Sequence, residues 1–271
     1  MSEATKAKEM DMLNGKLAGK LILFAIPLAF SSILQQLFNS ADVAVVGRFA
    51  GSNALAAVGS CVALVGIFVN LIVGLAVGPN AALANLIGQN KREKISGMLH
   101  TILTFGAVLG IVLMGVGMLT ARTVLEASGT PESVMADALL YIRIYFLGIP
   151  ALALYNFGNA VFSAAGDTGR PLRYLFLSGI VNVILNLFFV IICGMAADGV
   201  AWASIISQYV SAILVIIHMT REKDSCGLSF RELKIYKGRA KPILMLGVPA
   251  GFQNAVFAVA NLFIQRAVNS F

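Results

Sequence analysis

Asp42 is the one acidic residue that the sequence places within an apolar segment long enough to cross a membrane. An ionisable side chain at that depth costs several kcal/mol unless it is neutralised or paired, so it indicates a functional site. Ser32, Gln35 and Asn39 precede it at spacings that put all four side chains on one stripe of a helix. In lipid, such a stripe must face protein or a water-filled cavity.

Three further polar stripes occur in later apolar segments. They consist of Asn156, Asn159 and Ser163; Ser178, Asn182 and Asn186; and Ser204, Gln208 and Ser211. Each stripe alone is explained equally well by hydrogen bonds that hold neighbouring helices together. Taken with the carboxylate stripe, the four stripes predict a hydrated cavity inside a helix bundle.

An interfacial position is the alternative for Asp42. From Leu21 to Asp42 a helix already rises ~31 Å at 1.5 Å per residue, which is about the thickness of the hydrocarbon core. The carboxylate would then reach interfacial water or Arg48, and it would have no role in function.

Other chemistry has no recognisable pattern in the sequence. His100 and His218 are isolated at the ends of predicted spans, and Cys61, Cys193 and Cys226 have no paired spacing. The sequence contains no HExxH, GxSxG or phosphate-loop motif. We therefore expect neither an enzyme nor a bound metal or cofactor.

The elements that must position the polar stripes are membrane-spanning helices. The chain of 271 residues is 58% hydrophobic and 12% charged, with a mean hydropathy of +0.85, whereas soluble domains are roughly 25% charged. Apolar runs of about 20 residues recur, which is the length that crosses a bilayer. The sequence predicts an all-α polytopic membrane protein with spans near residues 21–46, 54–78, 98–120, 138–164, 175–195, 199–218 and 243–268.

Glycine and proline mark special positions in these spans. Gly74 with Gly78, and Gly106 with Gly110, form small-residue faces that are typical of close helix packing. Pro27, Pro79 and Pro150 each remove a helical hydrogen bond and permit a bend.

The basic residues indicate topology. Most of the 20 Lys and Arg residues fall in the N-terminal tail and in the second, fourth and sixth connections, which lie on one side of the predicted bundle. The positive-inside rule makes that side, and the N-terminus with it, cytoplasmic. The excess over 13 acidic residues is therefore not the footprint of a nucleic-acid-binding protein.

The sixth connection also divides the chain. It separates a tail (1–20) and a six-helix lobe (21–218) from a linker (219–241) and a seventh helix (242–271). Aligning Pro27 with Pro249 also pairs Phe30 with Phe252, as expected for a parallel repeat. We therefore expect the seventh helix to begin a second lobe that this chain does not complete.

The sequence resembles the multidrug and toxic-compound extrusion (MATE) family over essentially its whole length. The matching segments, in this order, are NSADVAVVGRFAG from Asn39, GIPALALYNFGNAVFSAAGDTGRP from Gly148, VNVILN from Val181 and GVAWASIISQ from Gly199. The resemblance implies two six-helix lobes that export organic cations in exchange for protons or sodium.

The resemblance also implies a coupling site. Asp42 matches the first-helix acid that binds the coupling cation, and Asn182 matches an asparagine of the same site. Asn186 falls where some members have a second aspartate, and Ser204 falls where threonine is common. With one carboxylate instead of two, the site carries less charge, which favours protons slightly over sodium.

The resulting expectation is a secondary active antiporter for cationic or amphipathic drugs that works by alternating access in the plasma membrane. Its partners would be lipids, small-molecule substrates and the C-terminal lobe of the same polypeptide. Two alternatives are a lipid-linked oligosaccharide flippase, which would need cations in its cavity, and a structural subunit without transport. The expected cavity residues are Gln35, Asn39, Asn156, Asn159, Ser178 and Gln208.

Overall fold

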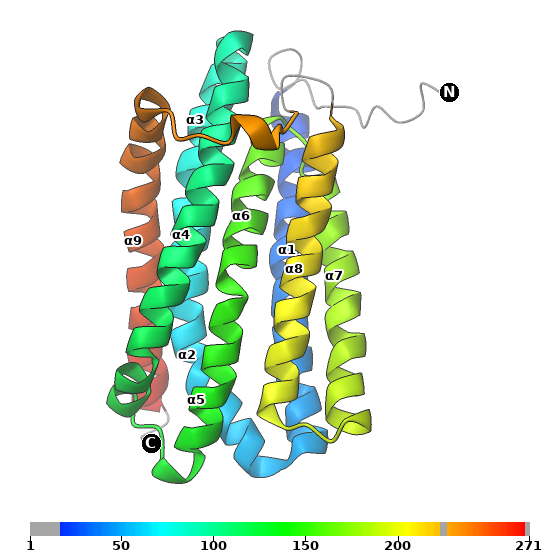
Figure 1. Cartoon of the computed structure of the whole chain (residues 1–271), viewed down its shortest axis with the longest axis vertical. Coiled ribbons are helices and arrows are strands. Elements are labelled where there is room, and N and C mark those ends of the chain that lie inside the picture. Colours follow the sequence, from blue (N-terminus) through cyan, green and yellow to red (C-terminus); the bar gives the residue numbers. More distant parts are fainter. Residues whose placement is uncertain (1–16, 223–226, 269–271) are drawn as a thin grey trace.

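Long helices that run up and down through the molecule make up the fold (Figure 1). The computed structural model describes residues 17–222 and 227–268, and within these ranges it contains no strand. The helices of the first half are α1 (Leu17–Val45), η2 (Val46–Ala50), α2 (Gly51–Leu75), α3 (Val77–Gly88) and α4 (Arg92–Ala127). Those of the second half are α5 (Glu132–Leu147), α6 (Ile149–Ala164), α7 (Gly169–Leu187), η3 (Phe188–Ile192), α8 (Ala197–Arg221), η4 (Phe230–Glu232) and α9 (Lys237–Val268).

The helical segments confirm the predicted membrane fold. Five segments of the described chain are long and apolar enough to cross a membrane, or six when α5 and α6, which meet at 43°, form one broken span. The first segment, Ala18–Gly88, runs down and back up in Figure 1 because the chain turns at Gly51. Gly51 has φ +87° and ψ 173°, a conformation that is essentially restricted to glycine. The described chain therefore makes the seven predicted passes.

Two passes are broken at prolines, as the sequence indicates. Pro150 has no N–H for the carbonyl of Phe146, and the break between α5 and α6 lies at Gly148. The Tyr209 hydroxyl of α8 donates a hydrogen bond of 3.1 Å to the Leu147 carbonyl beside this break. A side chain of the neighbouring helix therefore stabilises the bend.

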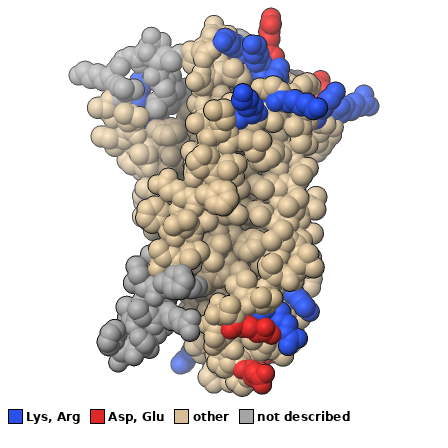
Figure 2. Space-filling model, turned by 90° about the vertical axis from the view of Figure 1, so that its left-hand side faces the viewer, with Lys and Arg blue, Asp and Glu red and all other residues tan. Residues whose placement is uncertain are grey.

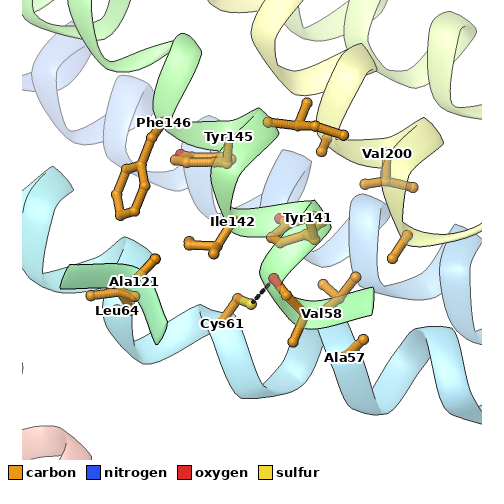
Figure 3. Close-up of a cluster of buried hydrophobic side chains, with 14 of the residues drawn as sticks. Ala57, Val58, Cys61, Leu64, Ala121, Tyr141, Ile142, Tyr145, Phe146 and Val200 are labelled. Atoms are coloured by element: carbon orange, nitrogen blue, oxygen red, sulfur yellow. Dashed lines mark hydrogen bonds between the residues drawn. The ribbon is translucent and has the colours of Figure 1, made fainter. Parts of the chain in front are cut away.

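A dry apolar core joins the lower halves of α2, α4, α5 and α8 (Figure 3). Phe68 of α2 and Phe146 of α5 pack with ring centroids 4.9 Å apart. Cys61 is fully buried, and its thiol donates to the Ala138 carbonyl at 3.4 Å. This core fixes α5, which carries tyrosines toward the polar side of the bundle, relative to α2.

Close backbone contact attaches α9 to α2 and α3. A Cβ at Gly74 would lie 2.6 Å from the Ala250 carbonyl oxygen, and one at Gly247 would lie 2.7 Å from the Leu75 carbonyl oxygen. The Leu75 carbonyl is also the group that Pro79 leaves without its helical N–H partner. Small residues on both helices thus form the seam, here called the glycine seam, that brings α9 against the second pass.

The opposite face of α9 is open. Phe252, Val256 and Phe257 are 66%, 65% and 62% exposed, although they are large and apolar. These side chains face lipid or another apolar partner. That residues 242–271 begin a second lobe remains a prediction.

An ion-pair cluster ties the upper ends of α7 and α8 together. Arg170 lies 2.6 Å from Asp167 and 2.5 Å from Glu222, and His218 lies 3.1 Å from Glu222. Partial burial acts to raise the pKa of Glu222, but the hydrogen bonds from Arg170 and His218 outweigh it and lower the pKa below its ordinary value. Glu222 therefore contributes to the stability of the cluster in its ionised form.

Gly74→Val is expected to destabilise the protein by about 1–3 kcal/mol because the new side chain would meet the α9 backbone. Thermal unfolding of the purified protein in detergent measures this loss. Gly59→Val on the same helix is the matched control, since no described atom lies within 4 Å of the position of its Cβ. Equal losses in the two variants would contradict the role of the glycine seam.

Glu222→Gln is expected to reduce the sensitivity of the protein to acid. The ionised Glu222 contributes its full stabilisation above its ordinary pKa of 4.5, and this contribution is lost as the pH falls through the lowered folded-state value. Unfolding temperatures recorded down through this range should therefore fall less in Glu222→Gln than in the wild type. Glu132→Gln, at an exposed acid of α5, should behave like the wild type.

Candidate functional site

The polar stripe of α1 faces a cavity of about 650 Å³ that is lined by residues of α1, α2, α5, α6, α7 and α8. Ser32, Gln35, Asn39 and Asp42 all line this cavity, as their helical spacing predicts. The volume falls within the range of pockets that hold drug-sized ligands. The structure therefore gives the predicted hydrated cavity a definite place in the bundle.

Asp42 is bound by neutral donors from two other helices. The Asn186 amide nitrogen of α7 donates to Asp42 Oδ1 at 2.5 Å, and the Ser204 hydroxyl of α8 donates to Asp42 Oδ2 at 3.1 Å. Asn186 also donates to Asn182 Oδ1 at 3.2 Å, while Asn182 donates to the Ser204 hydroxyl at 3.5 Å. The structure thus brings together the four predicted cation-site residues in one closed ring of hydrogen bonds, here called the polar ring.

The helices that carry the polar ring change their winding next to it. The π-helical turn η2 (Val46–Ala50) follows Asp42 on α1, and the π-helical turn η3 (Phe188–Ile192) follows Asn186 on α7. The two turns contact each other. Such π turns are frequent at functional sites because they shift the register of side chains along a helix.

The charge of Asp42 has no cationic partner among the described residues. None of the ion pairs in the described part of the chain includes it, and its partners Asn186 and Ser204 are buried. Its hydrogen bonds point into the bundle rather than to Arg48, which is exposed. A carboxylate with only neutral donors can still gain a cation.

One acceptor of the polar ring is unused. Asn186 Oδ1 is buried and has no hydrogen-bond partner among the described atoms. Rotation of this amide by half a turn would exchange its nitrogen and oxygen, so the group can donate to a carboxylate or accept from a protonated one. Asn186 can therefore adapt to either charge state of Asp42.

The other expected cavity residues divide into two groups. Ser178 of α7 and Gln208 of α8 line the cavity together with Gln35 and Asn39. Asn156 and Asn159 of α6 are not among the residues that line it, in contrast to the prediction from sequence.

The side chains of the α6 stripe form hydrogen bonds within α6. The Asn156 amide donates to the Leu152 carbonyl at 2.8 Å, and the Ser163 hydroxyl donates to Asn159 Oδ1 at 3.3 Å. The polar side chains of the α6 stripe thus form hydrogen bonds within their own helix instead of facing the cavity.

Three tyrosines of the bent span were missed as cavity residues. Tyr141 and Tyr145 of α5 line the cavity, as does Tyr155 of α6. Tyr141 and Tyr145 stack with ring centroids 6.2 Å apart. Their spacing of four residues was the available signal, because it puts two aromatic hydroxyl groups on one helix face.

Comparison with known proteins agrees with this geometry. The family model MatE matches residues 27–188. The chain is 30% identical over 267 residues to the probable multidrug resistance protein YpnP of Bacillus subtilis, covering 97% of this chain and 59% of that protein. It is 28% identical to the probable multidrug resistance protein YoeA of the same species, covering 92% of this chain and 55% of that protein.

A solved structure shows the same fold. The crystal structure of MATE in the straight conformation superimposes with a TM-score of 0.86 at 23% identity, covering 97% of this chain and 59% of that one. The chain thus spans little more than half the length of the relatives that it matches. The family model matches more than half of the chain, so the chain belongs to the MATE family of membrane transporters.

Proposed function

We propose that this chain is the N-terminal part of an antiporter that exports organic cations in exchange for an inflowing cation. One observation carries the proposal: a carboxylate without a cationic partner lies in the wall of a cavity large enough for a drug. The amides, hydroxyls and tyrosines around it suit an amphipathic cation, since they offer both hydrogen bonds and aromatic faces.

The mechanism follows from competition for Asp42. While Asp42 is charged, it accepts hydrogen bonds from α7 and α8 and attracts a cationic substrate to the cavity. When a coupling cation neutralises Asp42, both attractions weaken, so α1 can repack and the substrate is released. An alternating-access cycle then needs only that the coupling cation and the substrate favour different states of α1.

The lining of the cavity favours this reading over a flippase for lipid-linked oligosaccharides. A pyrophosphate group calls for Lys or Arg, and the described lining residues include neither. A structural subunit without transport would have no need of a polar cavity in its interior, since filling that space with packed apolar side chains would stabilise the bundle.

We propose the proton as the coupling cation. Sodium would need several oxygen ligands, and the Asn186 N–H group already binds two of the available oxygens, Asp42 Oδ1 and Asn182 Oδ1. A proton needs only the carboxylate and an acceptor beside it. The Ser204 hydroxyl, or Oδ1 of a rotated Asn186, can act as that acceptor.

The proposal includes the place of the chain in a larger protein. We propose that 21–218 forms the N-terminal lobe and that 242–271 begins a C-terminal lobe of the same polypeptide, which would meet the exposed face of α9. The basic connections favour a plasma-membrane orientation with the N-terminus in the cytoplasm, and membrane lipids surround the apolar faces.

Asp42→Asn in the full-length protein is expected to abolish cation-driven drug export, because an amide cannot exchange charge with a coupling cation. Export of a fluorescent organic cation from cells with equal amounts of protein in the membrane measures the effect. Asp137→Asn, at an exposed acid of α5, is the matched control and should export at the wild-type rate. Normal export by Asp42→Asn would remove Asp42 from the mechanism.

Proteoliposomes loaded with a fluorescent organic cation test the choice of ion. If protons drive export, collapsing the pH gradient at constant sodium should stop transport, and a sodium gradient alone should not restore it. Transport sustained by sodium alone would overturn the proton assignment and leave the role of Asp42 intact.

A further inference from the structure

A short segment between α8 and α9 lies along the side of the bundle. Residues 227–241, here called the strap, include η4 (Phe230–Glu232) and the first turn of α9. In Figure 1 the strap, drawn in orange, crosses in front of α4 and α6 and lies well below the upper end of α4. It therefore runs beside the helix ends instead of looping above them.

Hydrogen bonds to α4 fix the strap at this depth. The Ser229 N–H donates to His100 Nε2 at 3.0 Å, and the Tyr236 N–H donates to the Thr101 hydroxyl at 3.3 Å. At 1.5 Å per residue, His100 and Thr101 lie ~12–14 Å along α4 from its start at Arg92. Both residues lie close to residue 98, where the predicted membrane span begins, so the strap lies at the level expected for the lipid headgroups.

The beginning of α9 is attached to the same face of α4. The Arg239 guanidinium passes so close to Gly97 that any side chain at residue 97 would collide with it. The Arg239 guanidinium carbon also lies 4.9 Å from the centre of the Tyr236 ring. Gly97, His100 and Thr101 thus form one docking face, and the strap is held by its backbone and by Arg239.

Leu228 of the strap is buried in the apolar core, whereas three other large apolar side chains of the strap are exposed. Phe230, Leu233 and Ile235 are 63%, 40% and 39% exposed, although they are large and apolar. Four exposed basic residues alternate with them or follow them, and no ion pair among the described residues includes any of the four. These basic residues are Arg231, Lys234, Lys237 and Lys241.

The charge of this surface is strongly one-sided. Glu232 is the one acidic residue within 227–241, and it lies 4.0 Å from His100. Figure 2 shows several Lys and Arg side chains at the upper end of the molecule, some of them extending sideways, with fewer Asp and Glu side chains among them.

We infer that the strap binds the headgroups of anionic phospholipids. Exposed apolar side chains that alternate with basic ones suit the boundary between acyl chains and headgroups, where each kind meets its own environment. Unpaired Lys and Arg residues within a Debye length of an anionic surface attract it. A soluble acidic partner would match the charges, but it would need an apolar surface of its own to cover Phe230, Leu233 and Ile235.

The strap continues directly into α9, so lipid bound to the strap also restrains the beginning of this helix. Anionic headgroups that hold Lys237 and Lys241 hold the first turns of the helix that the glycine seam attaches to α2. The lipid composition thereby acts on the position of α9 relative to α4. This inference concerns the membrane surface, and it holds whether or not the cavity transports drugs.

Tryptophan quenching by brominated lipids tests the inference. Phe230→Trp in a Trp202→Phe background puts the one tryptophan of these 271 residues on the strap, and any tryptophan elsewhere in the full-length polypeptide is replaced by phenylalanine. The protein is reconstituted in equal parts phosphatidylcholine and phosphatidylglycerol, with bromine on one lipid or the other. We expect quenching by brominated phosphatidylglycerol to be roughly twofold stronger, since local attraction enriches the anionic lipid several-fold.

Neutralising the basic residues should remove this preference. In the reporter background, the triple variant Arg231→Gln, Lys234→Gln and Lys237→Gln should be quenched equally by both lipids. High salt should have the same effect on the reporter protein without any of these changes. The control replaces Arg48, Arg122 and Arg143, which lie away from the strap, by glutamine.

The control should keep the preference for phosphatidylglycerol. Equal quenching by the two lipids in the reporter protein at low salt would overturn the inference, as would a preference that survives the strap substitutions. An absence of quenching by either lipid would show that the strap does not reach the bilayer, and it would equally overturn the inference.

Discussion

A carboxylate that enters an apolar bundle must exchange its water molecules for other hydrogen-bond donors, and Asp42 finds these donors on α7 and α8. Neither donor carries a charge, so these hydrogen bonds lower the free-energy cost of burying the Asp42 carboxylate but leave its negative charge uncompensated. This requirement determines the arrangement of three helices, because α1, α7 and α8 must converge within hydrogen-bond distance at one level. The polar ring depends on that convergence, and the cavity and the two π turns lie beside it.

The polar ring could be predicted from sequence because lipid makes polar side chains costly unless they meet. Ser32 to Asp42, and Asn182 with Asn186, stand out at helical spacing in segments that are otherwise apolar. The α6 stripe shows where this reasoning ends. Asparagine can also bond to its own backbone, as Asn156 does with Leu152, and sequence spacing does not distinguish that local bond from one across a cavity.

The number of passes and the breaks at Pro79 and Pro150 also followed from sequence, since hydropathy and the missing N–H act locally. Small-residue faces were visible too, but their partners were not. Gly74 and Gly78 meet α9, whereas Gly106 meets Phe157 and Gly110 meets the backbone at Pro150. A glycine pair shows that something approaches closely, and only the fold shows which helix it is.

Two helices that line the cavity, α2 and α1, differ in how much apolar packing holds them in place. The glycine seam joins α9 to α2 by backbone contact, and α2 is in turn anchored in the dry core around Phe68 and Phe146. Among the described side chains of α1, only Ser31 and Val45 are buried, so apolar packing contributes little to its position. The hydrogen bonds of Asp42 therefore act beside a few other contacts that hold α1, such as the packing of Phe38 against Gly179 and the hydrogen bond from the Thr168 hydroxyl to the Phe24 carbonyl. An element with few buried apolar contacts is the one that a local change can move. A change in the charge of Asp42 would act directly on the contacts that join α1 to α7 and α8.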